Sequence, residues 1–495
     1  MSEGTEVRLV MKHVQTIPIA PRDPSCFKEV LGNEVWEALA GAWRGGVARL
    51  SGRTVWNVNT TAAGGGVAEM LRSLVAYARG AGADVRWAVI SPPSGIDDFF
   101  AVTKRVHNML HGHVGDGLGL GRGAQAVYRA ALEPGALELR ALVRPGDVVI
   151  LHDPQTAGLV PAMRAAGVGV IWRCHVGADA PNGEAHEVWD FLRPFVEQAD
   201  RYVFSRSGHV WDGLDPRRTL IVAPSIDAFS PKNQDLSRQQ IDAILSAAGA
   251  ISGRPAAAPR FVRQDGSVGR VERAVQMLGT TWIDPSAPLV TQVSRWDTLK
   301  DPLGVMEGFV DHVLPAVPHA QLALVGPETA AVADDPEGAQ VLTHCQEAWA
   351  AYPAAVRARV ALVCLPMTDL EENAAIVNAI QRHSTVIVQK SLAEGFGLTV
   401  SEAMWKSRPV IASRVGGIVD QIVDGDSGVL VQDPTDLREF GNAVSTILRC
   451  PADAARIAQR ARETVADRFL ATRSLMQYAR ALATLKRDTA APAAA

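Results

Sequence analysis

Two glutamates on either side of a glycine turn have the spacing in this sequence that most directly suggests chemistry. Glu394 precedes the turn Gly395-Phe396-Gly397, and Glu402 follows eight residues after Glu394, within a run expected to be helical. Glycines let the backbone approach a ligand, and the first N–H groups of a helix face an anion. These groups would take a phosphate while the carboxylates take sugar hydroxyls. A tight turn without a ligand is the alternative, because glycine-rich turns are common.

Two cations follow the apolar run 288–293, which is expected to be a strand. Arg295 and Lys300 are five residues apart at its end. They form either a compact anion site or two ordinary surface cations on a solvated loop. Asp424-Gly-Asp426 has the letters of a metal-binding motif, but it falls in a turn after a helix, so no metal is expected there.

Polar residues also end two apolar runs in the first half of the chain. Asp147–Leu151 runs into His152-Asp153-Pro154-Gln155, and 168–172 runs into Arg173-Cys174-His175. The carboxyl ends of parallel strands line the crevice where α/β sheets bind ligands. Asp153 either binds an acceptor there or caps the following helix, since aspartate is a good N-cap.

Two further stretches attract attention through glycine and histidine. Gly64-Gly65-Gly66 follows the expected strand 55–59 and opens a helix, but it is not a dinucleotide-binding GxGxxG. His107, His111 and His113 lie in a glycine-laden region. No cysteine joins them and Asp116 is the acid nearby, so a mobile or substrate-facing loop is favoured over a metal site.

The elements that would position these residues alternate regularly. Strands and helices follow one another in both halves of the chain, which predicts an α/β protein with two doubly wound sheets. In the second half the expected strands are 288–293, 320–325, 359–365, 385–389, 409–413 and 428–431. Residues 236 to about 264 are expected to be a helical connector, with 271–278 as its possible continuation. Residues from about 452 to 487 are expected to be helical.

Bulk properties narrow the class of protein. The 495 residues exceed the usual size of one domain, and the net charge of −4 gives no reason to expect nucleic acid or an anionic membrane as partner. The five cysteines are scattered and odd in number, which suits a reducing cytosol. No secretory signal or membrane-spanning run is recognisable, so a cytoplasmic location is expected.

Longer stretches around these residues resemble one known family. EGFGLTVSEAM, followed by PVIAS and Gly416-Gly417, resembles the donor-sugar signature of retaining GT-B glycosyltransferases of family four. WNVNTTAAGGGVAEML, HDPQTAGL, WRCH and PSID look like its trehalose glycosyltransferring synthase subgroup. One position departs: the subgroup has an aspartate two residues after WRCH, where this chain has Gly177, and the nearest acid is Asp179.

The resemblance implies a GT-B fold, with two Rossmann-like domains facing a central cleft. An N-terminal extension would cover 1–50, an acceptor domain 51–284 and a nucleotide-sugar donor domain 285–465. A C-terminal helix, 466–488, would cross back to the first domain, and 489–495 would form a disordered tail.

The resemblance also implies site residues. It assigns catalysis to Glu394, His175, Arg295 and Lys300, donor binding to Arg295, Lys300, Gly395, Phe396, Gly397, Leu398, Thr399 and Glu402, and acceptor binding to Asp153, Gly65, Gly66 and Gln155. The implied reaction is retaining transfer of glucose from a nucleoside-diphosphate glucose to glucose, giving α,α-trehalose. No metal and no cofactor are expected, and a homodimer is compatible with the sequence. A retaining trehalose phosphorylase and a non-catalytic sugar-nucleotide sensor are the alternatives.

Overall fold

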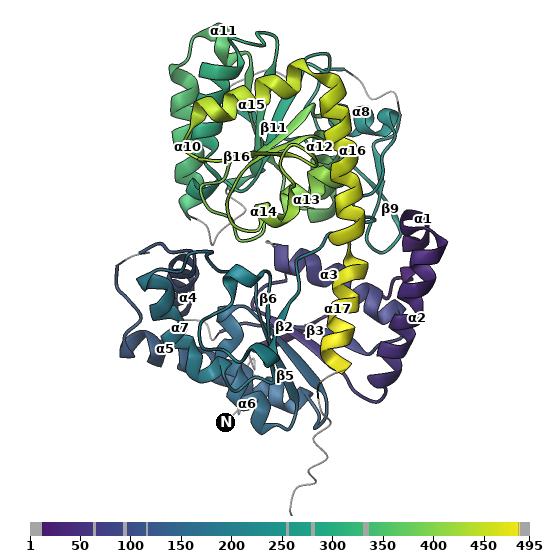
Figure 1. Ribbon diagram of the computed structural model, residues 1–495, viewed down its shortest axis with the longest axis vertical. Coiled ribbons are helices and arrows are strands. Elements are labelled where there is room, and N and C mark those ends of the chain that lie inside the picture. The colour runs from purple at the N-terminus through teal and green to yellow at the C-terminus, as the bar shows by residue number, and fades with distance from the viewer. Residues whose placement is uncertain are drawn as a thin grey trace, which may run out of the picture. The chain divides into compact units, whose positions relative to one another are not determined.

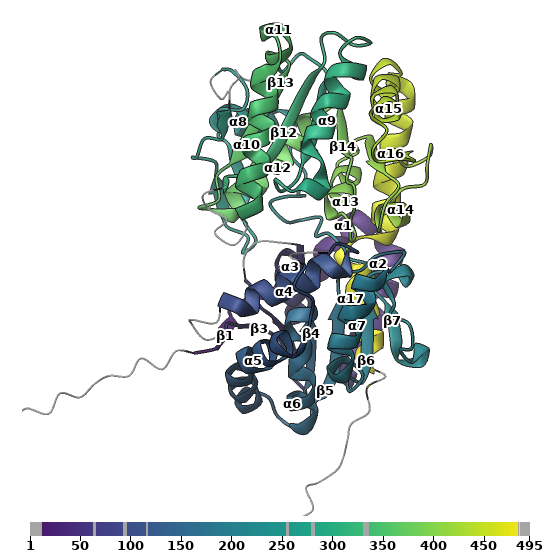
Figure 2. The same ribbon diagram turned by 90° about the vertical axis from the view of Figure 1, so that its left-hand side faces the viewer.

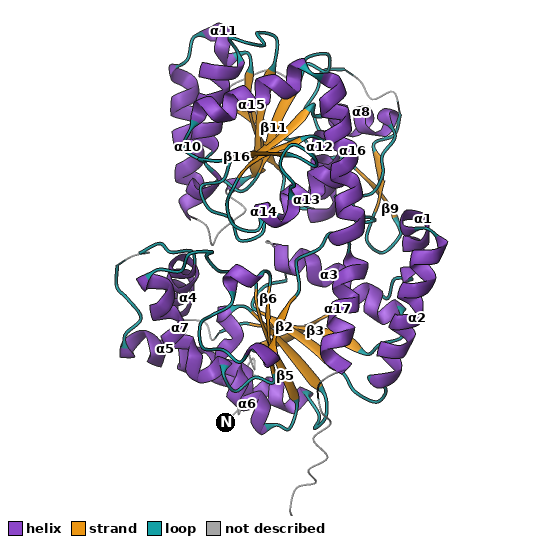
Figure 3. Ribbon diagram, in the orientation of Figure 1, coloured by secondary structure: helices purple, strands orange, loops and turns teal. Residues whose placement is uncertain are grey.

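The computed structural model describes residues 12–62, 66–92, 97–114, 117–253, 257–278, 283–329, 336–483 and 485. Contacts divide the chain into two compact units. The first unit comprises Met1–Ala223 and Thr472–Ala495, and the second comprises Pro224–Ala471. Each unit contains one seven-stranded sheet with helices on both faces (Figure 1, Figure 3).

The sheet of the first unit has the strand order β1-β3-β2-β4-β5-β6-β7. Its strands are β1 (Val14–Ile17), β2 (Val55–Asn59), β3 (Val85–Ile90), β4 (Val148–His152), β5 (Gly169–Cys174), β6 (Arg201–Phe204) and β7 (Thr219–Ile221). The edge strand β1 pairs antiparallel with β3, and the other pairs are parallel. Parallel strands covered on both faces require continuous apolar runs, and β2 and β4 are buried along their whole length.

Helices form a layer on each face of this sheet (Figure 2). One layer packs into the main core and contains α4 (Asp97–Leu110), α5 (Arg122–Leu142), α6 (Val160–Ala165) and α7 (Gly183–Val196). The other contains α2 (Asn33–Arg49), which follows the short α1 (Lys28–Leu31), with α3 (Gly66–Gly80) and α17 (Ala471–Ala483). The C-terminal helix α17 thus belongs to the first unit although the chain reaches it from the second.

The second unit repeats the arrangement with the order β10-β13-β12-β11-β14-β15-β16. Its strands are β10 (Gln276–Leu278), β11 (Leu289–Val293), β12 (Gln321–Pro327), β13 (Val360–Leu365), β14 (Val386–Gln389), β15 (Val410–Ser413) and β16 (Val429–Val431). One face packs on α9 (Pro302–Gly308), α10 (Pro336–Ala351), α15 (Leu437–Arg449) and α16 (Pro451–Arg468). The other packs on α8 (Arg238–Ala247) and α12 (Leu370–His383). The short helices α11 (Ala354–Arg357), α13 (Leu398–Trp405) and α14 (Ile418–Gln421) complete the unit.

The predicted strands of the second half are confirmed to within two residues, because each is a buried apolar run bounded by turn residues. The prediction of a helical connector is partly wrong. α8 forms, but β8 (Arg260–Val262) and β9 (Val268–Arg270) then make an antiparallel hairpin, and β10 adds an antiparallel edge strand to the sheet. The interval predicted to be helical near the C-terminus contains two helices, separated at Phe469 and Leu470.

The first compact unit ends at Ala223, whereas the sequence places the domain boundary after residue 284. The difference arises because α8 and the hairpin that follows it pack on α12 and share its core. Strand β1, within the predicted extension, joins the first sheet. Among the described helices, none combines the length and the apolarity that crossing a membrane requires.

Candidate functional site

The turn that carries Glu394 is packed against a second glycine pair. Gly397 has φ of +79° and precedes α13. Gly416 has φ of +50°, and a Cβ there would lie 1.6 Å from the carbonyl oxygen of Glu394. The N–H of Gly417 donates to the Gly395 carbonyl at 3.0 Å. The two glycine pairs of the sequence motif therefore meet in space, and only glycine fits at position 416.

A buried glutamine holds the same turn from beneath. The Gln421 side-chain amide donates to the carbonyl of Phe396 and, at 3.3 Å each, to the carbonyls of Gly397 and Gly417. Its own oxygen accepts a hydrogen bond from the Ser401 hydroxyl. Sequence reasoning missed Gln421, because no local spacing shows that a side chain 24 residues past Gly397 returns to it.

Helix α13 begins directly at this turn. No side chain caps it at Gly397, so its first N–H groups retain the capacity to bind an anion. Thr399 in its first turn donates through its hydroxyl to the Gln389 side chain at 3.1 Å. The Phe396 ring is buried and packs edge-on against Phe469. The turn is therefore preformed, with a helix start at its end.

The structure brings Glu394 and Lys300 together. The Lys300 ammonium lies 2.5 Å from Oε2 of Glu394, and the Ser391 hydroxyl donates to the same oxygen at 3.3 Å. Both side chains are mostly buried, with 17% of Lys300 and 11% of Glu394 exposed. A cation and a carboxylate thus lie side by side next to the turn, where either can bind a charged or hydroxylated ligand.

Lys300 is held in place by the residue that follows it. Asp301 has a left-handed backbone with φ of +48°, caps α9 by accepting from the Gly304 N–H at 3.0 Å, and contacts the buried Lys390 ammonium. The Lys300 carbonyl accepts from the Gln292 side chain at 2.6 Å. These contacts therefore fix the backbone of the loop after β11.

Arg295 lies at the end of the same strand in a more open setting. Its guanidinium is 3.2 Å from the Asp297 carboxylate, and half of its side chain is exposed. Asp297 also caps the following turn by accepting from the Leu299 N–H at 2.8 Å. The two predicted cations thus differ, with Lys300 held against Glu394 and Arg295 at the solvent side.

Glu402 is buried inside α13, with 1% of its side chain exposed. Its Oε1 is 2.8 Å from the Lys232 ammonium, and its Oε2 has no hydrogen-bond partner in the described structure. The sequence did not indicate Lys232, which lies 170 residues before Glu402. One oxygen of the carboxylate therefore remains available to a hydrogen-bond donor.

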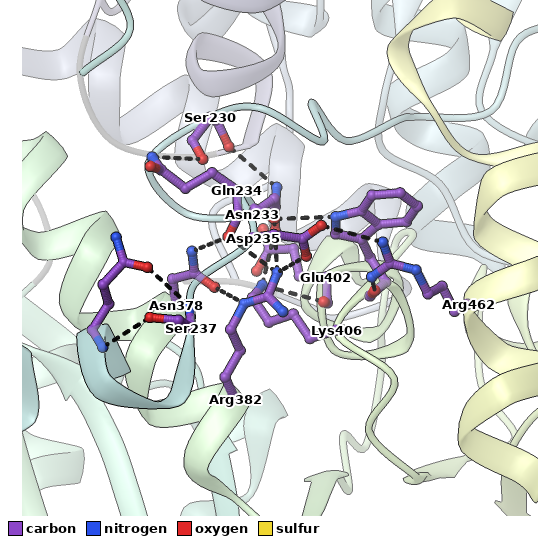
Figure 4. A network of polar contacts seen from close by, with 12 residues as sticks. Ser230, Asn233, Gln234, Asp235, Ser237, Asn378, Arg382, Glu402, Lys406 and Arg462 are labelled. Carbon is purple, nitrogen blue, oxygen red and sulfur yellow. Dashed lines mark hydrogen bonds and ion pairs between the residues drawn. The ribbon is translucent and has the colours of Figure 1, made fainter. Parts of the chain in front are cut away.

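Hydrogen bonds around Asn233 hold the segment that carries Lys232 against other parts of the second unit (Figure 4). The Asn233 carbonyl accepts from the Trp405 indole at 3.1 Å, and its side-chain oxygen accepts from the Lys406 ammonium at 2.9 Å. Arg382 donates to the same carbonyl at 3.2 Å and forms an ion pair with Asp235. This network fixes the segment against the C-terminal end of α13.

In the first unit, Asp153 stands at the carboxyl end of β4 with φ of +66°. Its carboxylate accepts from the backbone N–H of His175 at 2.8 Å and makes no cap hydrogen bond to the turn that follows. The alternative that Asp153 caps a helix is therefore wrong. Burial raises the pKa of Asp153 to about 6.

His152 and His175 face each other at the ends of β4 and β5. Nδ1 of His152 lies 3.2 Å from Nε2 of His175. Nε2 of His152 lies 3.1 Å from Oδ1 of Asn57. Burial lowers the pKa of His152 to about 3 and holds that of His175 well below its ordinary value, so both rings are neutral at pH 7. Arg173 donates to Nε2 of His175 at 3.4 Å.

The other residues predicted for the acceptor are placed less fully. Gln155 lies in the 3-10 turn Pro154–Leu159, and Gly66 is the first residue of α3. Gly65 lies outside the described residues. The rings of His107 and His111 pack edge to face, 4.9 Å apart. The described residues contain no group of three metal-ligating side chains with the geometry of a metal site.

Comparisons with known proteins show which family the chain resembles. Residues 57–210 match the model of the trehalose synthase N-terminal domain, and residues 370–464 match that of glycosyl transferases group 1. A trehalose synthase of Pyrococcus horikoshii is 34% identical over 473 residues, covering 95% of this chain and 98% of that protein. A trehalose phosphorylase of Pleurotus sajor-caju is 26% identical over 75% of this chain and 50% of its own length. The solved α,α-trehalose-phosphate synthase (UDP-forming) of Burkholderia vietnamiensis aligns with a TM-score of 0.61 at 16% identity, covering 86% of this chain and 97% of that one.

The mainly parallel sheets and the structural likeness show the GT-B fold, as predicted. The match to glycosyl transferases group 1 defines the class of enzyme as a glycosyltransferase. Within that class, the chain belongs to the trehalose synthase family. It is an enzyme of trehalose metabolism that transfers a glycosyl group.

Proposed function

We propose that this enzyme makes α,α-trehalose by transferring glucose, with retention, from a nucleoside-diphosphate glucose to free glucose. The observation that carries the proposal is the contact between Lys300 and Glu394 beside the uncapped start of α13. This places a cation, a carboxylate and a helix N-terminus together on the second unit, which suits a sugar diphosphate. The structural neighbour from Burkholderia vietnamiensis is a UDP-forming synthase, which supports a nucleotide donor.

The diphosphate would be bound by Lys300, Arg295 and the N–H groups at the start of α13. Negative charge grows on the departing phosphate as its bond to the anomeric carbon breaks. Fixed donors aimed at developing charge are strongly stabilising where water is largely excluded. Lys300 meets that condition because its loop is held by Asp301 and its side chain is mostly buried.

The sugar would lie against Glu394. Its carboxylate has one oxygen on Lys300 and Ser391, so the other oxygen can accept from glucose hydroxyls. The same charge would stabilise the oxocarbenium-like centre. Glu402 would hold the ribose through Oε2, which has no partner among the described residues.

The acceptor glucose would bind at the carboxyl end of β4, with Asp153, Gln155, Gly65 and Gly66 as proposed contacts. His175 would contact a sugar hydroxyl through its imidazole ring. In the transfer step, the bond from the anomeric carbon to the phosphate oxygen breaks and the bond to the acceptor oxygen forms. The acceptor proton moves to the leaving phosphate, so no external base or metal is needed to balance the step.

The competing function is phosphorolysis of trehalose, which the 26% identity to a fungal trehalose phosphorylase favours. Inorganic phosphate would then occupy the place of the diphosphate. Purified enzyme is incubated with trehalose and either phosphate or one of UDP, ADP and GDP, and the products are identified. NDP-glucose formed with a nucleoside diphosphate supports the proposal, whereas glucose 1-phosphate formed with phosphate alone overturns it.

A further inference from the structure

A second polar cluster lies at the sheet edge of the first unit that carries Asp153 and His175. β5 and β6 are parallel neighbours, and the loops after them meet beyond their carboxyl ends. Asp179 lies on the first loop, four residues after His175, and Arg206 and His209 lie on the second. This edge is where α/β sheets bind ligands.

The carboxylate of Asp179 is fixed yet accessible. Both of its oxygens contact the same terminal nitrogen of Arg206. The Arg206 side chain is only 12% exposed, whereas that of Asp179 is 42% exposed. Exposed ion pairs between two mobile side chains are weakly ordered, but here the cation is held in the protein. The outward lone pairs of the carboxylate remain available to hydroxyl donors.

Two glycines let the loops approach this closely. A Cβ on Gly208 would lie 2.7 Å from Oδ1 of Asp179, and a Cβ on Gly177 would lie 2.6 Å from Cγ of His209. Neither contact leaves room for a side chain. Gly177, where the family resemblance leads one to expect an aspartate, is thus the position on which the His209 ring rests.

His209 is the third residue of the cluster, and its ring nitrogens can still form hydrogen bonds. Its side chain is fully buried, and in the described structure neither ring nitrogen has a hydrogen-bond partner. Its Nε2 lies 3.8 Å from Oδ1 of Asp179. Burial lowers the pKa of His209 to about 4, with Asp179 opposing that shift and Arg206 and His111 adding to it, so the ring is neutral at pH 7. The carboxylate is the more exposed member of the ion pair, so a ligand meets its negative charge first.

We propose that Asp179, positioned by Arg206 and His209, binds a pair of hydroxyls on the acceptor sugar and selects an uncharged hexose over a hexose phosphate. A carboxylate accepts hydrogen bonds from two adjacent hydroxyls, and it repels a phosphate group that would otherwise be drawn to Arg206. This assignment rests on the proposed function, since it concerns the acceptor of that reaction.

The test compares wild type, Asp179→Asn and the matched control Asp190→Asn, which removes an exposed carboxylate from α7. Initial rates are measured with glucose and with glucose 6-phosphate as acceptor, using the NDP-glucose on which the wild type is most active. For Asp179→Asn, the KM for glucose rises by about 10- to 100-fold, the range expected for losing a hydrogen bond to a charged group. Its preference for glucose over glucose 6-phosphate falls at least about tenfold, while the KM for the donor changes less than about twofold. Asp190→Asn behaves as wild type.

Asp179→Ser, which removes the carboxylate and has a smaller side chain, is the second variant and gives the same rise in KM. Glucose and trehalose binding to all forms is also titrated calorimetrically, so that Asp179 is tested even if no NDP-glucose supports synthesis. In that case the proposed function fails, while weaker binding to the variants still supports the role of Asp179. An unchanged KM for glucose, or unchanged binding where no turnover exists, overturns the proposal.

Discussion

Replacing Lys300 with methionine tests the charge arrangement on which the proposed function depends. The substitution keeps an unbranched side chain but removes the ammonium that lies 2.5 Å from Glu394. Because both side chains are mostly buried, solvent screens this contact only weakly. Removing one preorganised donor from developing negative charge costs about 3–4 kcal/mol, so kcat should fall by roughly 100- to 1000-fold.

The assay measures kcat with both substrates saturating, using separated and identified trehalose as product. Arg456→Met is the matched control, because it removes an exposed cation from α16 in the same unit, and it should retain wild-type turnover. Lys300→Arg should recover part of the lost rate, since it restores the positive charge with a different shape.

The folded fraction of Lys300→Met must be measured alongside its rate. The substitution leaves the largely buried Glu394 without its cation, and an unpaired buried polar group costs about 1–3 kcal/mol of stability. A folded Lys300→Met protein that turns over within about fivefold of wild type would refute the proposed stabilisation of the leaving group.

Three further outcomes are expected. Asp153 has a pKa of about 6, so its carboxylate takes up a proton as the pH falls through that value. We therefore expect kcat/KM for glucose to fall on the acid side of pH 6. The pH profile of Asp153→Asn should not show this acid-side decrease. Gly416→Ala should lower the free energy of unfolding, measured by denaturant titration, by about 1–3 kcal/mol and displace Glu394. The control Gly425→Ala changes a glycine that also has a positive φ but has open space around it, so it should cost only about 1 kcal/mol. Lys232→Met should cost about 3 kcal/mol in the same titrations, because the carboxylate that Lys232 pairs with is buried; an unchanged midpoint would contradict that role.

The regular elements were predictable because their signals are local. β11, β14 and β15 are short apolar runs ended by turn residues, and each was located from the sequence to within one residue. The hairpin β8–β9 was missed because its strands are three residues long and largely exposed. Such strands carry no apolar run, and their pairing depends on packing against the rest of the unit.

The candidate site was predictable only in part. Glu394 and the glycine turn form one continuous motif, whereas the contact of Glu394 with Lys300 joins residues 94 positions apart. Which cation reaches the carboxylate depends on the course of the loop after β11. Sequence spacing gave no reason to distinguish Arg295 from Lys300. In the structure they differ, because Arg295 is half exposed and pairs with Asp297, whereas Lys300 is mostly buried and pairs with Glu394.

The sequence by itself determined the strands β11 to β16, the glycine turn with its flanking glutamates, and the polar residues that end β4 and β5. Periodicity and turn chemistry are properties of neighbouring residues, so they can be read along the chain. Only the tertiary structure decided that Gln421 supports the turn, that Lys232 pairs with Glu402, and that His209 rests on Gly177. These contacts join residues that lie far apart along the chain, and they exist only because the fold of each unit brings those segments together.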